Sequence, residues 1–256
     1  MKIKRLLGWT TALVLGVVIL AAVAGLTFRA ALGPPVHDHA PDAVYAPRGV
    51  VATSQPLASQ AGLQVLQQGG NAVDAAVVAA AVLNVVEPYM TGLGGDMFAI
   101  LWSEREQRLV GINGSGRAGA LMTRDALGGN VRDKGAESIT IPGALSGWAA
   151  LLESYGTITL AEALAPAIEL AEQGFPVSKT TAGEWALFES ILKSDPGARD
   201  TYLVDGKRAP RAGEWISNSD LARTMQAIAD GGPKSLYGGP LGQRIAGHVQ
   251  ALGGFL

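Results

Sequence analysis

The sequence has no cysteine and only three histidines, His37, His39 and His248. Without thiols, this chain has no disulfide bond, no thiolate nucleophile and no cysteine-ligated zinc. With so few histidines, a mechanism built on a Ser-His-Asp triad has little to use. Charged residues make up only 16% of the chain, and a net charge of −2 with no basic stripe argues against nucleic-acid binding.

Apolar residues and glycine, in contrast, are abundant. Hydrophobic residues make up 48% of the chain, and 34 of its 256 residues are glycine. This composition is typical of a compact globular protein with many tight turns. The length is sufficient for one large domain or two small ones.

The N-terminus carries a membrane-targeting pattern. Lys2, Lys4 and Arg5 precede the uncharged apolar run Leu6–Phe28. A bilayer-spanning helix needs about 20 such residues, whereas a signal-peptide core has about 7–15. Residues 1–28 are therefore either a signal anchor or a signal peptide, with Ala22–Ala24 as a candidate cleavage site. The basic residues predict a cytoplasmic N-terminus and an exported remainder, periplasmic or extracellular.

Residues 29–47 are predicted to form a proline-rich linker. The linker contains His37-Asp38-His39, which we interpret as a solvated tether rather than a metal site. We expect no metal and no cofactor in this chain.

From Arg48 onward the patterns predict a mixed α+β domain over residues 48–256. Gly49–Thr53 is predicted as a strand, and Ser54 as the N-cap of a helix over Pro56–Gln68. Asn71 is predicted to cap a second helix, which is apolar all round and therefore buried. The remaining expected elements are the helix Ala72–Val86, a hairpin of Met97–Trp102 and Arg108–Asn113, and helices over Gly143–Tyr155, Leu160–Gln173, Lys179–Leu192, Asp220–Ala229 and Leu241–Leu252.

Gly114–Gly119 matches the G-x-G-x-x-G pattern of dinucleotide-binding proteins. That function requires a helix to begin at the motif, so that its N-terminal amides meet the phosphates. Ala120–Asp133, which follows, is a poor helix interrupted by Gly128-Gly129. The motif therefore predicts a turn rather than a nucleotide site.

The order of several short blocks in residues 48–256 resembles the N-terminal part of the large subunit of the γ-glutamyltranspeptidase family. The most specific block is Gly69-Gly70-Asn71-Ala72-Val73-Asp74-Ala75-Ala76. The others include Gly49–Ser54, Val86–Pro88, Gly92–Phe98, Ile141–Ala144, Leu164–Ala171, Gly174–Val177, Asp220–Ala222, Leu236-Tyr237 and Gly253-Gly254.

This resemblance implies an N-terminal-nucleophile hydrolase with a four-layer αββα sandwich, incomplete in this chain. Such a precursor cuts itself into two subunits, and the new N-terminal threonine of the small subunit attacks an amide carbonyl. Its own α-amino group, with a pKa of about 8, serves as the general base. No threonine of this chain is assigned that role, and the threonine motif is expected downstream. We therefore expect residues 48–256 alone to lack amidase activity and to unfold with poor cooperativity.

One departure from the family pattern concerns substrate recognition. The transpeptidase pattern has an arginine that holds the α-carboxylate of the glutamyl group, and a guanidinium suits a carboxylate geometrically. Ser115 occupies that position here, and Arg117 follows two residues later. This Gly-Ser-Gly-Arg variant resembles the amidohydrolase or acylase-like branch of the family. Arg117 either binds a substrate carboxylate or forms a structural ion pair or solvated surface, and for Ser115 a local turn is favoured.

The leading functional hypothesis is a γ-glutamyltransferase or glutathione hydrolase, acting on γ-glutamyl amides such as glutathione. Its expected partners are this substrate, its own small subunit and the membrane. One alternative is a related amidohydrolase or acylase with a different acyl group. The other is a non-catalytic, membrane-tethered fragment.

Overall fold

The computed structural model describes residues 44–256. The predicted leader and most of the predicted linker, including His37 and His39, lie outside these residues. Ala46–Leu256 form one compact unit. Within residues 44–256, no helix has both the length and the apolar character that crossing a bilayer requires.

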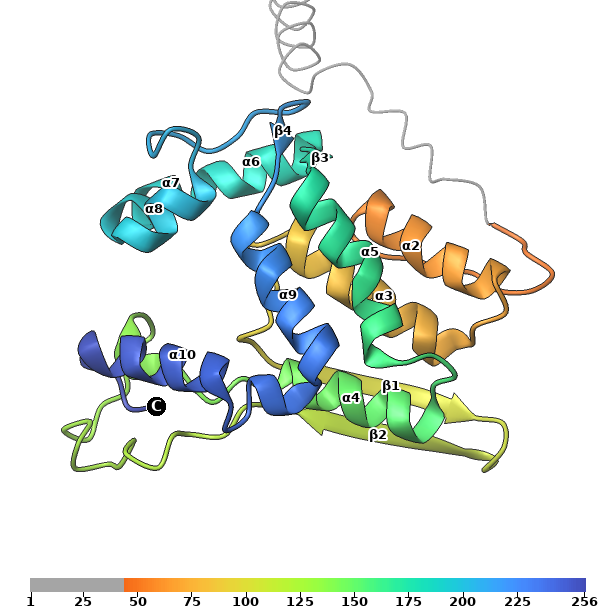
Figure 1. Ribbon diagram of the computed structural model, residues 1–256, viewed down its shortest axis with the longest axis horizontal. Helices are drawn as coiled ribbons and strands as arrows, with labels where there is room; N and C mark the ends of the chain where they lie inside the picture. Colours follow the sequence, from red (N-terminus) through yellow and green to blue (C-terminus); the bar gives the residue numbers. More distant parts are fainter. Residues whose placement is uncertain (1–43) are drawn as a thin grey trace, which may run out of the picture. The chain divides into compact units, whose positions relative to one another are not determined.

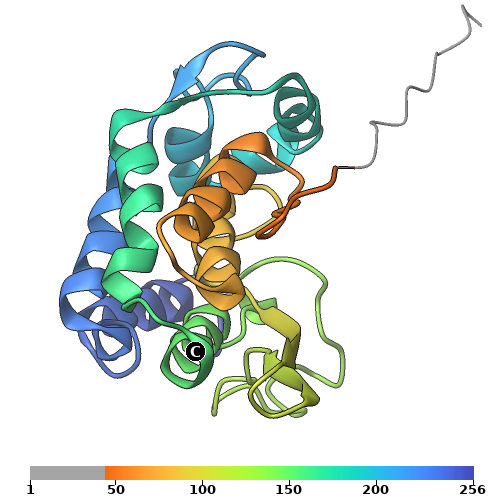
Figure 2. The same cartoon turned by 90° about the vertical axis from the view of Figure 1, so that its right-hand side faces the viewer.

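A stack of four helices forms the centre of this unit. Its members are α2 (Pro56–Gln67), α3 (Ala72–Val86), α5 (Leu160–Gln173) and α9 (Ser219–Gly231). Figure 2 shows α5 between α9 and α3, with α2 on the outer side of α3. The core includes Val78, Val82, Leu164, Met225 and Ile228, each completely buried.

The N-terminus of α3 is fixed by its own side chains and by a distant loop. Asn71 accepts hydrogen bonds from the N–H groups of Val73 and Asp74, and Asp74 accepts one from the N–H of Asn71. The buried carboxylate of Asp74 also accepts hydrogen bonds from the Thr157 N–H at 2.8 Å and the Thr157 hydroxyl at 2.5 Å. Asp74 therefore ties α3 to the loop before α5.

The hairpin lies beneath this stack (Figure 1). Strands β1 (Met97–Ser103) and β2 (Arg108–Gly114) pair antiparallel, with Met97 opposite Gly114 and Ser103 opposite Arg108. Helix α4 (Ala144–Tyr155) packs on one face. It approaches closely because Gly147 has no side chain: a Cβ there would lie 2.3 Å from the Met97 sulfur.

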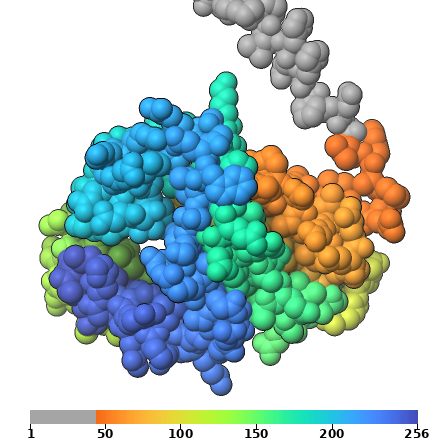
Figure 3. Space-filling view, turned by 45° about the horizontal axis from the view of Figure 1, so that its top comes forward, coloured from red at the N-terminus to blue at the C-terminus, as the bar shows by residue number. Residues whose placement is uncertain are grey.

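The remaining elements extend the helical part. Helices α6, α7 and α8 form a lobe beside α9, coloured cyan in Figure 3. Strands β3 and β4 form a second, short antiparallel pair. The bounds are β3 Phe175–Pro176, α6 Lys179–Leu187, α7 Glu189–Ser194, α8 Pro196–Tyr202, β4 Trp215–Ile216 and α10 Pro240–Ala251, with short 3-10 turns at Ala136–Ser138 and Pro233–Ser235.

Several predicted elements are confirmed. The hairpin, α3 and α5 agree with the sequence patterns to within one residue, and no helix follows the G-x-G-x-x-G motif. The fold is mixed helix and sheet, as predicted. Residues 44–256 contain only two two-stranded sheets, so the four-layer sandwich stays a prediction.

Other local predictions were wrong. Gly49–Thr53 pairs with no strand among the described residues. Gln55, not Ser54, caps α2, because the Ser54 hydroxyl instead donates to Glu87 at 2.7 Å. The predicted helix Lys179–Leu192 breaks at Phe188 into α6 and α7. Helix α8 was not predicted at all.

Candidate substrate-binding site

The glycine-rich bend between α3 and β1 is held against the start of α4. The carbonyl oxygen of Gly95 accepts hydrogen bonds from the N–H groups of Gly143 and Ala144, both at 2.9 Å. Within the bend, the Gly95 N–H donates to the Gly92 carbonyl at 3.0 Å. These bonds fix the backbone of the bend in one conformation.

A third segment, which follows β2, crosses the bend and the start of α4. The Gly116 N–H donates to the Asp96 carboxylate at 2.6 Å, and the Ile141 N–H donates to the Arg117 carbonyl at 2.9 Å. A Cβ at Gly116 would lie 2.0 Å from the Ile141 carbonyl oxygen, and one at Gly143 2.2 Å from that of Gly114. Glycine is therefore required here by backbone-to-backbone approach.

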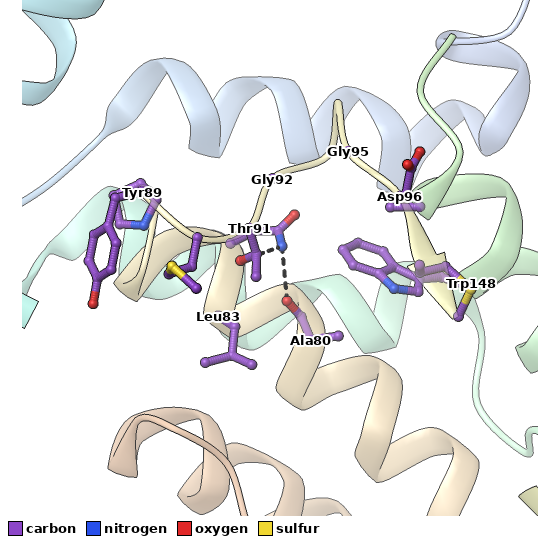
Figure 4. Close-up of a pocket in the computed structure, with 13 residues that line it drawn as sticks. Ala80, Leu83, Tyr89, Thr91, Gly92, Gly95, Asp96 and Trp148 are labelled. Carbon is purple, nitrogen blue, oxygen red and sulfur yellow. Dashed lines mark hydrogen bonds between the residues drawn. The ribbon is translucent and has the colours of Figure 1, made fainter. Parts of the chain in front are cut away.

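A pocket of about 350 Å³ opens where α3, the bend, β1 and α4 meet. In Figure 4, Tyr89 lies at one end and Trp148 at the other, with Gly92 and Gly95 along one side. The volume falls in the range of small-molecule sites, and most of the lining is apolar. The lining residues are Ala80, Leu83, Asn84, Pro88, Tyr89, Met90, Thr91, Gly92, Gly95, Asp96, Met97, Ala144 and Trp148.

Asn84 is the main polar group of this pocket, and it is only 5% exposed. Its Nδ2 donates to the Ala80 carbonyl at 3.2 Å and to the Thr91 hydroxyl at 3.1 Å (Figure 4). Its Oδ1 is buried and has no hydrogen-bond partner among the described residues. An unpaired buried acceptor costs about 1–3 kcal/mol. Because this oxygen has essentially no exposed surface, a ligand N–H can pair with it only after the Asn84 side chain turns toward the pocket.

The charge of the pocket lining comes from a single carboxylate. The lining contains no lysine, arginine or histidine, and its only carboxylate is Asp96, which is bonded to Gly116. Burial, together with a hydrogen bond to Glu184, raises the pKa of Tyr89 to about 12. The Tyr89 hydroxyl is neutral at physiological pH, and it donates its hydrogen bond to Glu184.

Neither side chain predicted from the sequence lines this pocket. Ser115 is exposed, and its N–H donates to Asn113 Oδ1 at 2.9 Å, which fits the favoured turn role. Arg117 is also exposed, and its guanidinium forms no ion pair with residues 44–256. The structure thus brings the backbone of this segment to Asp96 but leaves both side chains outside the pocket. The structural ion pair for Arg117 is not found among the described residues.

Comparison with known proteins identifies the family. The family model of γ-glutamyltranspeptidase matches residues 58–256. The chain belongs to this family. The glutathione hydrolase-like YwrD proenzyme of Bacillus subtilis (strain 168) is 40% identical over 210 residues, which cover 81% of this chain and 40% of that protein. The chain thus spans well under half the length of this relative.

Two solved structures of the family share the fold. Helicobacter pylori γ-glutamyltranspeptidase matches with a TM-score of 0.79 and 28% identity, over 84% of this chain and 63% of that one. A cephalosporin acylase from Bacillus halodurans matches with a TM-score of 0.73 and 38% identity, over 84% of this chain and 44% of that one. The resemblance predicted from the sequence blocks, including its acylase-like branch, is confirmed.

Sequence reasoning missed Asn84 and Trp148, which line the candidate pocket. The sequence contained one signal for Asn84: it is the only amide side chain in α3, a helix otherwise rich in alanine and valine. Trp148 is buried in α4, and only the packing of α4 on the bend brings it to the pocket. Among residues 44–256, no group of acidic residues and histidine could hold a metal ion.

Proposed function

We propose that the full-length protein containing this chain is an N-terminal-nucleophile amide hydrolase, and that the pocket at Asn84 receives part of its amide substrate. The observation that carries the proposal is a mainly apolar pocket whose wall contains Asn84, an amide whose buried Oδ1 has no partner and would gain one if the side chain turned toward a ligand. An amide N–H is a hydrogen-bond donor of the kind that this oxygen lacks.

The charge of the pocket favours an amidohydrolase or acylase with an uncharged acyl group. A glutamyl group carries an α-carboxylate, and burying that charge without a cation is costly. The pocket lining has no cation, and Ser115 replaces the arginine of the transpeptidase pattern. The second candidate is hydrolysis or transfer of γ-glutamyl groups, supported by the exposed Arg117 one residue after Gly116.

The proposed nucleophile is a threonine with a free amino group, supplied by another part of the full-length protein. Thr91 is the only threonine that lines the pocket, and peptide bonds on both sides leave it without a free amine. In the proposed reaction, the threonine oxygen attacks the amide carbonyl and its amino group takes the proton. The proton passes to the leaving amine, and water or an acceptor amine then releases the acyl group.

The substrate class can be tested on the full-length protein with two p-nitroanilides. One carries a γ-glutamyl group and the other an uncharged acyl group of similar length. We expect faster release of p-nitroaniline from the uncharged substrate. Faster release from the γ-glutamyl substrate would contradict this expectation and favour the second candidate, hydrolysis or transfer of γ-glutamyl groups.

The role of Asn84 can be tested with Asn84→Leu. Loss of one hydrogen bond is worth about 0.5–1.5 kcal/mol, so kcat/KM should fall roughly two- to tenfold. The substitution removes the unpartnered buried acceptor but also the two hydrogen bonds that Nδ2 donates, and because these effects on stability oppose each other, thermal stability should change little. Asn130→Leu, in an exposed loop, is the matched control. Equal kcat/KM in Asn84→Leu and the parent protein would refute the contact.

The second candidate makes its own prediction for Arg117→Ala. If Arg117 binds the α-carboxylate, the affinity for γ-glutamyl substrates should fall, while that for uncharged acyl substrates stays the same. Ser115→Arg should act in the opposite direction. Unchanged glutamyl affinity in both variants would exclude this role for the segment.

Export remains part of the proposal, on the basis of Lys2, Lys4, Arg5 and Leu6–Phe28. Fusion of residues 1–47 to alkaline phosphatase, which is active only outside the cytoplasm, tests it. Active phosphatase in the membrane fraction indicates an anchor, and active soluble phosphatase indicates a cleaved leader. An inactive fusion contradicts export.

A further inference from the structure

A second cavity lies next to the candidate site, under the helices of the α6–α8 lobe. Its volume is about 180 Å³. Four aromatic side chains line it, Tyr89, Trp185, Phe188 and Tyr202, and Ile191 and Leu192 complete the wall. We call this cavity the aromatic pocket.

The aromatic rings form a continuous wall. The Tyr89 ring stacks near the Phe188 ring, with centroids 6.2 Å apart and planes 22° apart. The Trp185 ring contacts Tyr89 at 6.4 Å on one side and Tyr202 at 6.3 Å on the other, where it meets the ring edge-on. Such a wall offers both ring faces and ring edges, which are the surfaces that another aromatic ring prefers.

One side of the aromatic pocket is buried and hydrogen-bonded, and the other side is exposed to solvent. Trp185 is only 3% exposed, and the Tyr89 hydroxyl donates to the Glu184 carboxylate at 2.7 Å. Phe188 and Ile191 are 38% and 41% exposed, so a ligand can reach the cavity past them. The break between α6 and α7 occurs at Phe188, and it is this break that places the Phe188 ring beside Tyr89.

The aromatic pocket and the candidate site share a wall. Pro88 and Tyr89, in the turn after α3, line both cavities. A molecule bound at Asn84 therefore has the aromatic pocket as its neighbour. The size of the cavity also limits the occupant, because an apolar cavity of about 150 Å³ accommodates one benzene.

We propose that the aromatic pocket binds a single phenyl-sized ring carried by the amide substrate. The ring-binding part rests on the cavity itself, whereas the word substrate rests on the proposed function. The two parts are tested separately, first by binding and then by turnover.

Binding is tested on the full-length protein with benzylamine, using ligand-observed NMR without turnover. We expect saturable binding, roughly two- to tenfold tighter than that of cyclohexylmethylamine, because ring-to-ring contacts favour the aromatic probe. 1-Naphthylmethylamine should bind more weakly than benzylamine, because two fused rings exceed the cavity.

Phe188→Ala should weaken benzylamine binding by a similar factor. Leu187→Ala is the matched control, because Leu187 precedes it in the chain, is 78% exposed and does not line the cavity. Ile191→Trp, which narrows the mouth, provides a second variant should Phe188→Ala fail to fold. Absence of saturable binding, or equal binding by Leu187→Ala and both pocket variants, overturns the proposal.

Turnover then identifies the half of the substrate that carries the ring. A phenylacetyl amide is compared with an acetyl amide, and a benzylamide with a methylamide. A higher kcat/KM for the phenylacetyl amide assigns the ring to the acyl half, and a higher kcat/KM for the benzylamide assigns it to the amine half. In either case the increase should be lost in Phe188→Ala. If benzylamine binds but no ring-bearing amide has a higher kcat/KM than its ring-free counterpart, the pocket does not bind the substrate. If no amide is hydrolysed at all, the proposed function fails while the ring-binding site stands.

Discussion

The helical stack and the hairpin of this protein both contain large apolar residues, but these residues have different surroundings. In the stack, Leu164 of α5 and Met225 of α9 have no exposed surface. In the hairpin, Phe98, Ile100 and Trp102 of β1 are 70%, 82% and 54% exposed. The large apolar side chains at the centre of the stack are thus fully buried, whereas those on one face of β1 are exposed among the described residues.

The difference follows from how many faces of each element have a neighbour. Helix α5 contacts both α3 and α9, so its apolar stripe is covered on two sides. The hairpin contacts α4 on the face of Met97, Ala99 and Leu101 only. A strand that is apolar on both faces is typical of a sheet with a layer on each side. This pattern agrees with the predicted four-layer sandwich, in which a second layer would lie on the open face.

The largest expected effect is in the stack. Leu164→Ala removes a completely buried side chain and leaves a cavity, so the opening free energy of α3, α5 and α9 should fall by about 2–5 kcal/mol. Hydrogen exchange of amides in these helices measures it. A change below 1 kcal/mol on that scale would mean that the stack repacks easily and is not the stable part of the domain.

A smaller effect is expected at the buried carboxylate that joins α3 to the loop before α5. Asp74→Asn weakens hydrogen bonds to a charged group, which are worth about 1.5–3 kcal/mol, so local opening should become easier. Exchange of the Thr157 and Ile158 amides, which donate to Asp74, measures this change. Unchanged protection at both amides would contradict the tie.

The same residue predicts a pH dependence. Burial raises the pKa of Asp74, but the hydrogen bonds from Thr157, Asn71 and Ile158 outweigh it and leave the pKa below its ordinary value of 3.8. Its contribution to stability is therefore complete above that value and is lost as pH falls through the lower, folded pKa. Thermal melts from pH 5 to pH 2 should show a steeper decline for the parent chain than for Asp74→Asn. Parallel declines would show that Asp74 does not titrate with folding.

The smallest effect is expected on the open face of the hairpin. Ile100→Ser, at a position 82% exposed, should change the stability of this chain by less than about 0.5 kcal/mol. The paired variant Leu101→Ser, on the face packed against the core, should be clearly more destabilising. If Ile100→Ser proves equally destabilising, both faces are buried and the comparison with the stack fails.

Much of the fold could be predicted because, for several helices, the start and end residues indicated by the sequence are the ones that cap the helix in the structure. Asn71 and Asp74 define the start of α3, and Gly174 follows the end of α5. The strand predicted at Gly49–Thr53 failed because a β-rich run indicates an extended chain and not its pairing partner. Asp195 and Pro196 are ordinary start signals for α8, and they could have been used.

The candidate site was less predictable than the fold. The glycine-rich bend and the Ser115–Arg117 segment could be identified from the family resemblance, and the structure places their backbones together. The contact between the Phe188 and Tyr89 rings joins residues about a hundred positions apart, and no local pattern in the sequence indicates it. Side chains that meet only through such long-range packing escape analysis of the sequence alone.

The hydrogen bonds from Thr157 to Asp74 also have a consequence for protein engineering. They close a chain segment whose ends are 83 residues apart, and that segment contains the exposed loop at residues 124–134. The entropy of closing a loop grows only with the logarithm of its length, so ten added residues would cost about 0.1 kcal/mol. An epitope tag or a dye-binding peptide inserted in the loop at residues 124–134 should therefore leave the domain folded. Such an insertion would label the domain at a site outside its core.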